Sequence, residues 1–182
     1  MKIVWRGPMY HGSKDLHHYI ETETLLGQLM VQGAPTRQQF AGWLSFKAQF
    51  FDGIERHIPP ACHRATAYRR DLASLGISEI PMMGAVQHRA WLDAPGLSPP
   101  ERERRLTGTA YVCVGSVFGA ERIRKLLAQA GKDYPVSSLQ FSDHRTEIAY
   151  LQQLRHRGDC VYEAMQTFAR MVKCCNEITG AT

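Results

Sequence analysis

The chain has 182 residues, of which 44% are hydrophobic and 21% are charged, a balance that excludes a disordered tail and a membrane protein. Its 22 Lys and Arg residues against 17 Asp and Glu residues give a formal net charge of +5, which suits an anionic ligand or an acidic partner protein rather than nucleic acid. The five cysteines form no CxxC pair, so that the sequence contains neither a zinc signature nor a disulfide framework.

The start of the chain, MKIVWRGPMYHG, lacks the apolar stretch of a signal peptide. No apolar run approaches the roughly 20 residues that span a bilayer. An odd number of cysteines is typical of free thiols in a reducing compartment. These features predict a cytoplasmic protein without a membrane segment.

The N-terminal half predicts three helices separated by proline and glycine. The first is expected over about residues 13–30, with Ser13 as its N-cap. A capping-box pattern at residues 36–39 starts the second, in which apolar residues recur at a spacing of three and four. Lys47 interrupts that apolar face, so its amine either extends to solvent or faces a ligand. The third helix is expected over about residues 60–75.

The C-terminal half predicts further helices after a loop at residues 77–97. They are expected at about residues 86–92, 98–127 and 144–157, and from about 160 onward, where apolar spacing continues to 175. Ser98, Asp143 and Asp159 are the expected N-caps of the last three. Because no convincing alternating strand, internal repeat or linker is found, the sequence predicts an all-α fold with one domain over residues 1–182.

Two glycines, Gly115 and Gly119, lie in the interior of the long predicted helix at residues 98–127. Each costs roughly 0.5–1 kcal/mol relative to alanine in that position. Four residues apart, they share one face of the helix. Such a pair permits either close packing of a second helix or a flat ligand against a kinked helix, and the spacing alone leaves both open.

His17 and Glu21 also lie four residues apart and share a helix face. A neutral imidazole can ligate a metal through one nitrogen while a carboxylate holds the other. The alternative is a surface or capping histidine. Further ligands at zinc spacing are missing, but one axial histidine is sufficient on one side of a haem iron. His18 points about 100° away, so only one of the two histidines can face such an iron.

Five segments carry a family resemblance through their order and spacing over about residues 10–178. They are Asp15-Leu16-His17-His18-Tyr19-Ile20-Glu21, the stretch from Thr36-Arg37 to Glu55, Asp71-Leu72 with Leu75-Gly76, GTAYVCVGSVFGAERI at 108–123, and Ala164 to Phe168. In these segments the chain resembles a bacterial haem oxygenase. The resemblance implies a multi-helix bundle with a kinked distal helix. It also implies an enzyme that degrades haem b, its substrate and cofactor, with O2 and electrons to biliverdin, CO and Fe(II).

The resemblance assigns roles to individual residues. His17 corresponds to the proximal iron ligand and Glu21 to a nearby carboxylate, while Gly115 and Gly119 correspond to the distal glycines. Lys14 matches a basic position near the haem propionates. Arg155 matches a second propionate-binding position, which falls on Arg157 if the alignment slips by two residues. Ser116 stands where many members have the Asp that orders water, and Ala120 where the family often has Gly. We therefore expect Ser116 to be the distal hydrogen-bond donor.

Two alternatives on the same helical scaffold stay open. Ser116 and Ala120 are also compatible with a haem-binding protein that has lost turnover. A thiaminase-like hydrolase would need a nucleophilic cysteine, for which Cys113 is available, but no supporting acidic cluster is visible. The clusters Arg69-Arg70 and Arg102 to Arg105 are expected to be solvated helix faces, one of which would dock an acidic electron donor such as a ferredoxin, or a reductase.

Overall fold

The structure, a computed structural model, describes residues 7–180 and consists of helices without a strand in that range. The α-helices are α1 (Pro8–Thr22), α2 (Leu25–Val31), α3 (Arg37–Asp52), α4 (Ala65–Ser74), α5 (Met83–Leu92), α6 (Pro99–Gln129), α7 (His144–Leu154) and α8 (Val161–Thr179). The predicted all-α fold is confirmed. Among these described helices, none combines the length and the hydropathy needed to cross a membrane.

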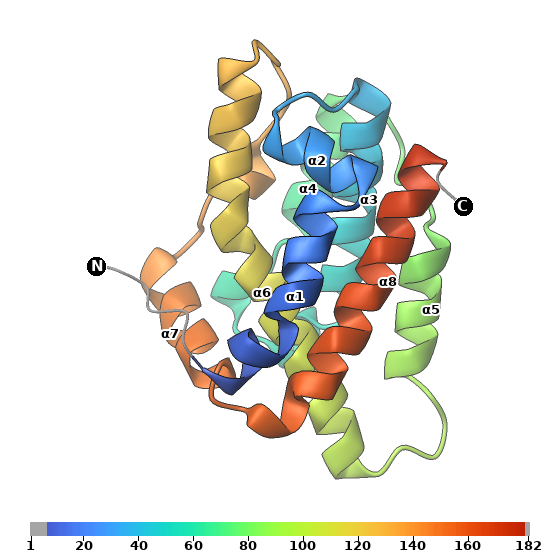
Figure 1. The fold of residues 1–182 in the computed structure, drawn as a ribbon, viewed down its shortest axis with the longest axis vertical. Helices are drawn as coiled ribbons and strands as arrows, with labels where there is room; N and C mark the ends of the chain where they lie inside the picture. The colour runs from blue at the N-terminus through green and yellow to red at the C-terminus, as the bar shows by residue number, and fades with distance from the viewer. Residues whose placement is uncertain (1–6, 181–182) are drawn as a thin grey trace.

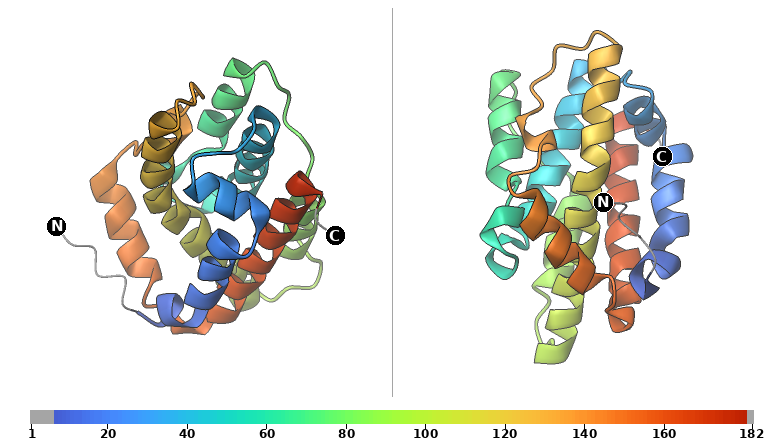
Figure 2. Two further views of the ribbon diagram at one scale, coloured as in Figure 1. Left: turned by 45° about the horizontal axis from the view of Figure 1, so that its top comes forward. Right: turned by 90° about the vertical axis from the view of Figure 1, so that its left-hand side faces the viewer.

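Helix α8 holds the bundle together, because α1, α5 and α6 all pack against it (Figure 1). Helices α3 and α4 pack on each other behind this layer, and α7 lies against α6 on the side opposite α5. The axis of α6 changes direction along its length (Figures 1 and 2), as predicted for the distal helix, although the helix is continuous over all 31 residues.

The first predicted helix is wrong in its bounds, because two helices occupy that stretch. Helix α1 already begins at Pro8, and Ser13 lies inside it, where its hydroxyl donates to the Met9 carbonyl at 2.6 Å. The chain turns after Thr22, and the Thr24 side chain caps α2 by accepting from the Gly27 amide at 3.0 Å. A Cβ on Gly27 would lie 1.7 Å from the Ile20 carbonyl oxygen, so this turn requires glycine.

The other predicted helix starts were partly correct. The capping box at Thr36 and the N-cap at Asp143 are confirmed, with Asp143 accepting from the amides of Arg145 and Thr146. The Asp159 cap is wrong: its carboxylate pairs with the Arg157 guanidinium at 3.0 Å instead of capping α8. A charged neighbour two residues away thus outcompetes the helix amides. The helix expected at residues 60–75 is a short 3-10 turn followed by α4.

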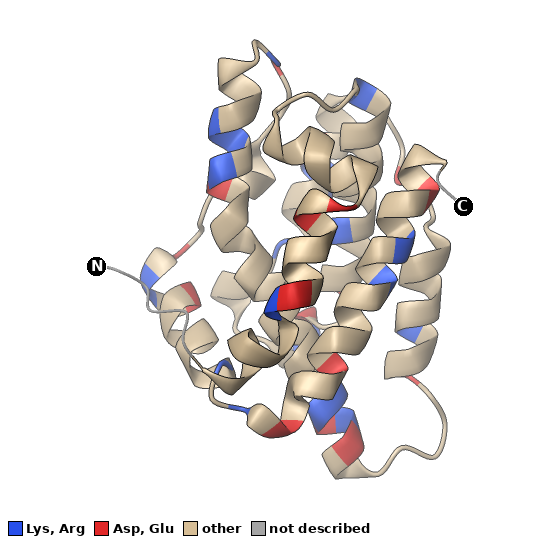
Figure 3. Ribbon diagram, viewed as in Figure 1, with Lys and Arg blue, Asp and Glu red and all other residues tan. Residues whose placement is uncertain are grey.

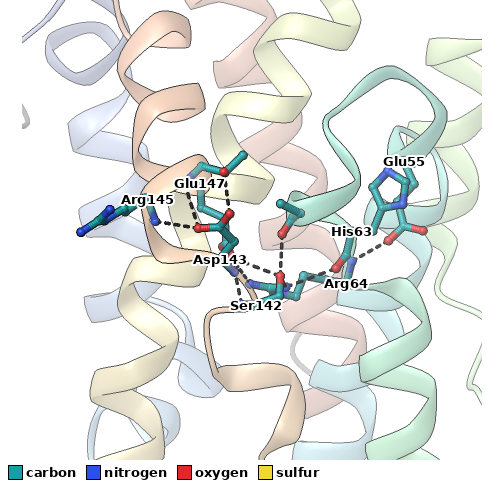
Figure 4. A network of polar contacts seen from close by, with 9 residues as sticks. Glu55, His63, Arg64, Ser142, Asp143, Arg145 and Glu147 are labelled. Carbon is teal, nitrogen blue, oxygen red and sulfur yellow. Dashed lines mark hydrogen bonds and ion pairs between the residues drawn. The ribbon is translucent and has the colours of Figure 1, made fainter.

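A buried ion pair fixes α7 to the start of α4 (Figure 4). The Arg64 guanidinium donates to Glu147 Oε1 at 2.6 Å, and their side chains are 3% and 1% exposed. The same oxygen accepts from the backbone amides of Ser142 and Asp143. Glu55 caps α4 by accepting from the amides of Arg64 and the following residue at 2.6 and 2.7 Å. This network fixes the start of α7 beside the start of α4.

His88 is a buried imidazole between α3, α6 and α8, 2% exposed. Its ring stacks on Phe50 with centroids 4.4 Å apart. Its Nε2 lies 3.3 Å from the hydroxyl of Thr109, which in turn contacts Thr167 at 3.1 Å. Nδ1 has no partner within residues 7–180. Burial lowers the pKa of His88 to about 3, so the folded protein keeps this ring neutral.

We expect the free energy of unfolding to fall as the pH is lowered from about 6.5 to about 5. In that window the unfolded chain takes up a proton at residue 88 and the folded chain does not, which costs about 1.4 kcal/mol per pH unit. Denaturant unfolding of His88→Gln over the same pH range should show a slope shallower by this amount. Equal slopes for the two proteins would contradict the burial of a neutral imidazole.

Candidate functional site

Two adjoining cavities lie between α1 and α6. The first, of about 280 Å³, extends between these two helices, and the second, of about 100 Å³, extends toward α2, α3 and α8. The residues that border both are His17, Ser116, Gly119 and Phe168. Three of the residues singled out in the sequence therefore meet at one place, although about 100 positions separate His17 from the other two.

His17 faces both cavities from α1 with a side chain that is 53% exposed. Its ring meets Phe168 edge-on at a centroid distance of 5.8 Å, and its Nδ1 lies 3.9 Å from Glu21 Oε1. Partial burial lowers the pKa of His17, against the opposing effect of the Glu21 carboxylate. The imidazole is thus neutral near pH 7, with a lone pair available to a metal. His18 is exposed and borders neither cavity.

The two distal glycines face open space. A Cβ on Gly119 would meet no atom within 4 Å, and one on Gly115 would meet only Leu151 Cδ1 at 3.7 Å. Gly108 on the same helix behaves differently, since its Cβ would lie 2.7 Å from the Ala164 nitrogen of α8. Close helix packing therefore explains Gly108, and it is wrong as an explanation for Gly119.

Ser116 borders both cavities, but its hydroxyl proton is already used. Its Oγ donates to the Cys113 carbonyl of the preceding helix turn at 2.6 Å. The oxygen lone pairs remain free to accept a hydrogen bond from the cavity side. In this rotamer Ser116 is an acceptor toward the cavity rather than the expected donor, and donation would require its χ1 to rotate.

Lys47 places a buried amine on the second cavity. It is 5% exposed, and its Nζ lies 5.6 Å from the Trp43 ring centroid and 5.4 Å from that of Phe46. Of the two possibilities left open by the sequence, extension to solvent is wrong. Burial lowers the pKa of Lys47.

Arg122 is a second basic residue on this cavity, and it was missed in the sequence. It is exposed on α6 and borders the second cavity near Glu21. Its position three residues after Gly119 places it on the same helix face. This spacing is the feature of the sequence from which Arg122 could have been predicted. Figure 3 shows basic residues toward both ends of α6, and the C-terminal group consists of Arg122, Arg124 and Lys125. Two of them, Arg124 and Lys125, pair with Glu121.

The two basic residues expected near the propionates do not border these cavities. Lys14 is exposed on α1. Arg155 follows α7, and its carbonyl accepts from the Met9 amide at 3.3 Å, beside the start of α1. The alternative, Arg157, is engaged with Asp159 and with Glu103 at 3.1 Å. Their roles toward haem stay predictions.

The residues of the cavities fit a haem in their chemistry. His17 offers a neutral nitrogen, Gly119 leaves room above the helix backbone, and Lys47 offers an amine that can pair with a carboxylate. The remaining walls are mostly apolar and aromatic, as a flat macrocycle requires. Within residues 7–180 no group of three His, Cys, Asp or Glu side chains could hold a free metal ion, whereas a haem iron needs one protein ligand on a side.

Comparison with known proteins gives a structural likeness. No family model matches the sequence, and no curated protein matches it. The structure is similar to the crystal structure of heme oxygenase-1 from the cyanobacterium Synechocystis sp. PCC6803 in complex with heme, with a TM-score of 0.79. The match covers 94% of this chain and 90% of that chain at 16% sequence identity, a level at which it shows the fold alone. The chain thus has the haem oxygenase-like fold.

Proposed function

We propose that this protein is a haem oxygenase, which degrades haem with O2 and electrons to biliverdin, CO and Fe(II). The observation that carries the proposal is the pairing of His17 on α1 with the open space over Gly119 on α6, across shared cavities. A histidine with a purely structural role would not require open space opposite it. A glycine that serves helix packing would be covered by the neighbouring helix. The likeness to a haem-complexed heme oxygenase-1 adds support at the level of the fold.

His17 is the proposed proximal ligand. The Glu21 carboxylate faces Nδ1, which leaves Nε2 to face the iron. When bound, haem supplies the oxygen chemistry, and a neutral histidine ligand gives an iron that binds O2. The protein orients the ring, and Phe168 restricts the movement of the imidazole by packing edge-on against it.

On the distal side, Gly115 and Gly119 provide space, and Ser116 provides a polar atom. Because the Ser116 hydroxyl donates to the Cys113 carbonyl, we propose that it orders a water molecule by accepting a hydrogen bond from it. The water would then be the donor toward the reacting oxygen. Ser116 therefore positions a water molecule and does not itself donate the proton.

The electron donor is proposed to be a ferredoxin or a reductase that approaches a basic surface. Three of the five arginines singled out for this role are already engaged with other side chains. Arg69 pairs with Asp52 and Glu79, Arg104 pairs with Glu163, and Arg105 stacks over Trp91 with its guanidinium carbon 4.9 Å from the ring centroid.

A non-catalytic haem-binding protein is the second candidate, and the hydrogen bond that occupies the Ser116 hydroxyl is the observation that favours it. The thiaminase-like alternative loses support. Cys113 is buried, and burial raises its pKa to about 12, so its thiol is protonated and a poor nucleophile.

The proposed function is tested by loading the purified protein with haem and supplying ascorbate, or a ferredoxin with its reductase, under air. Formation of a green product with the absorption spectrum of biliverdin supports the enzyme. Stable haem binding without that product favours the second candidate. Failure to bind haem overturns both.

The ligand assignment is tested by comparing two neighbouring alanine variants. We expect His17→Ala to lose the absorption spectrum of histidine-ligated ferric haem, because the imidazole on the cavity is removed. His18→Ala, the matched control, should keep it, because that side chain borders neither cavity. The opposite result would show that His18, and not His17, is the ligand, so that the assignment is wrong by one residue.

A further inference from the structure

Lys47 is a buried amine for which residues 7–180 provide no ion-pair partner. None of the hydrogen bonds or ion pairs in that range includes its Nζ, which lies over the faces of Trp43 and Phe46. The thiols of Cys113, Cys174 and Cys175 lie near enough to act on its pKa. Removing an ammonium group from water is costly unless it is paired. An apolar residue would therefore stabilise α3 better at this position.

The charged groups that face the second cavity are few. Glu21 borders it from α1, but its carboxylate is directed to His17 and makes no ion pair with Lys47. Arg122 borders it from α6 and adds positive charge. Apolar side chains such as Ile20 and Met30 form most of the remaining wall. The cavity thus combines an apolar lining with a buried amine that has no ion-pair partner among residues 7–180.

We propose that the second cavity is a carboxylate-binding subsite, in which Lys47 Nζ holds an acidic group of an otherwise apolar, flat ligand inside the bundle. The inference rests on the proposed function, under which that group is one propionate of haem. This carboxylate-binding subsite is separate from the surface positions of Lys14 and Arg155, because Lys47 projects from α3 into the interior. One propionate would then be enclosed, and this would fix the rotation of the ring about the iron–His17 axis.

The ligand-free protein provides the first test. Lys47→Met keeps the length of the side chain and removes the charge, so we expect its thermal unfolding midpoint to equal or exceed that of the wild type. A residue kept for stability would give the opposite result. If Lys47→Met does not fold, as judged by circular dichroism, then Lys47→Gln takes its place in the binding measurements.

The decisive experiment is a binding cycle read by quenching of tryptophan fluorescence, to which Trp43 contributes. The probes are haem, metal-free protoporphyrin IX and the dimethyl ester of each. We expect the preference of the wild type for the free acid over the ester to fall by at least about tenfold in Lys47→Met, for both haem and the metal-free porphyrin. Lys125→Met is the matched control, since this exposed lysine pairs with Glu121 outside both cavities and its loss changes the net charge equally.

The outcomes separate the two proposals. If all probes bind but the acid-to-ester ratio is unchanged in Lys47→Met, the subsite is overturned and haem binding stands. If the acid-to-ester preference falls equally in Lys125→Met, the effect is due to net charge, and this result also overturns the subsite. If neither the four probes nor sodium propionate binds the wild type, both the subsite and the proposed function fail. Sodium propionate serves as a probe of a free acid, and its binding without porphyrin binding would overturn the tetrapyrrole as ligand.

Discussion

Replacing Gly119 with leucine is expected to lower haem turnover on the order of 100-fold while leaving the free energy of unfolding within about 1 kcal/mol of the wild type. The first atom of the new side chain has room, because a Cβ there has nothing within 4 Å. The side chain projects into the cavities shared with His17, where it displaces the ligand. Turnover to biliverdin and denaturant unfolding are measured on the same preparation.

Gly108→Leu is the matched control for this experiment. It lies on the same helix, but its side chain would be forced against the backbone of α8, 2.7 Å from the Ala164 nitrogen. We expect it to lose at least about 1–3 kcal/mol of stability through overpacking. Ser116→Ala should lower turnover less than Gly119→Leu, because a backbone amide or another water can replace the single hydrogen bond lost at the water that Ser116 orders. Unchanged turnover in Gly119→Leu would remove the distal-helix assignment.

The largest loss of stability is expected from Glu147→Leu, at about 3–5 kcal/mol. The variant leaves the Arg64 guanidinium buried without its carboxylate, at a site where both side chains are almost fully enclosed (Figure 4). It also removes the acceptor for the amides of Ser142 and Asp143 at the start of α7. The free energy of unfolding in denaturant measures the effect.

The double variant Arg64→Leu with Glu147→Leu isolates the charge effect. It should be more stable than Glu147→Leu alone, because no uncompensated charge remains buried. A double variant as unstable as the sum of the single ones would show that the pair acts through independent packing. Because Leu151 of α7 lies 3.7 Å from a Cβ at Gly115, loosening α7 should also weaken haem binding.

Local chemistry explains why much of the fold could be predicted. The capping box at Thr36 and the N-cap at Asp143 involve atoms three or fewer residues apart, so the sequence contains all the information they need. The spacing of apolar residues likewise predicted α3 and α8, and the start signal at Ser98 predicted α6. The break after Thr22 was missed because it depends on a close contact between Gly27 and the Ile20 carbonyl, which no periodicity reveals.

The candidate site depended on tertiary structure to a larger degree. The sequence placed Gly115 and Gly119 on one helix face and His17 with Glu21 on another, since helix geometry alone fixes those relations. It could not distinguish glycines that pack against a helix from glycines that border a cavity. That difference arises because α8 approaches α6 at Gly108 and leaves Gly119 uncovered. The burial of Lys47 without a partner was decided in the same way, by where α1, α6 and α8 lie around α3.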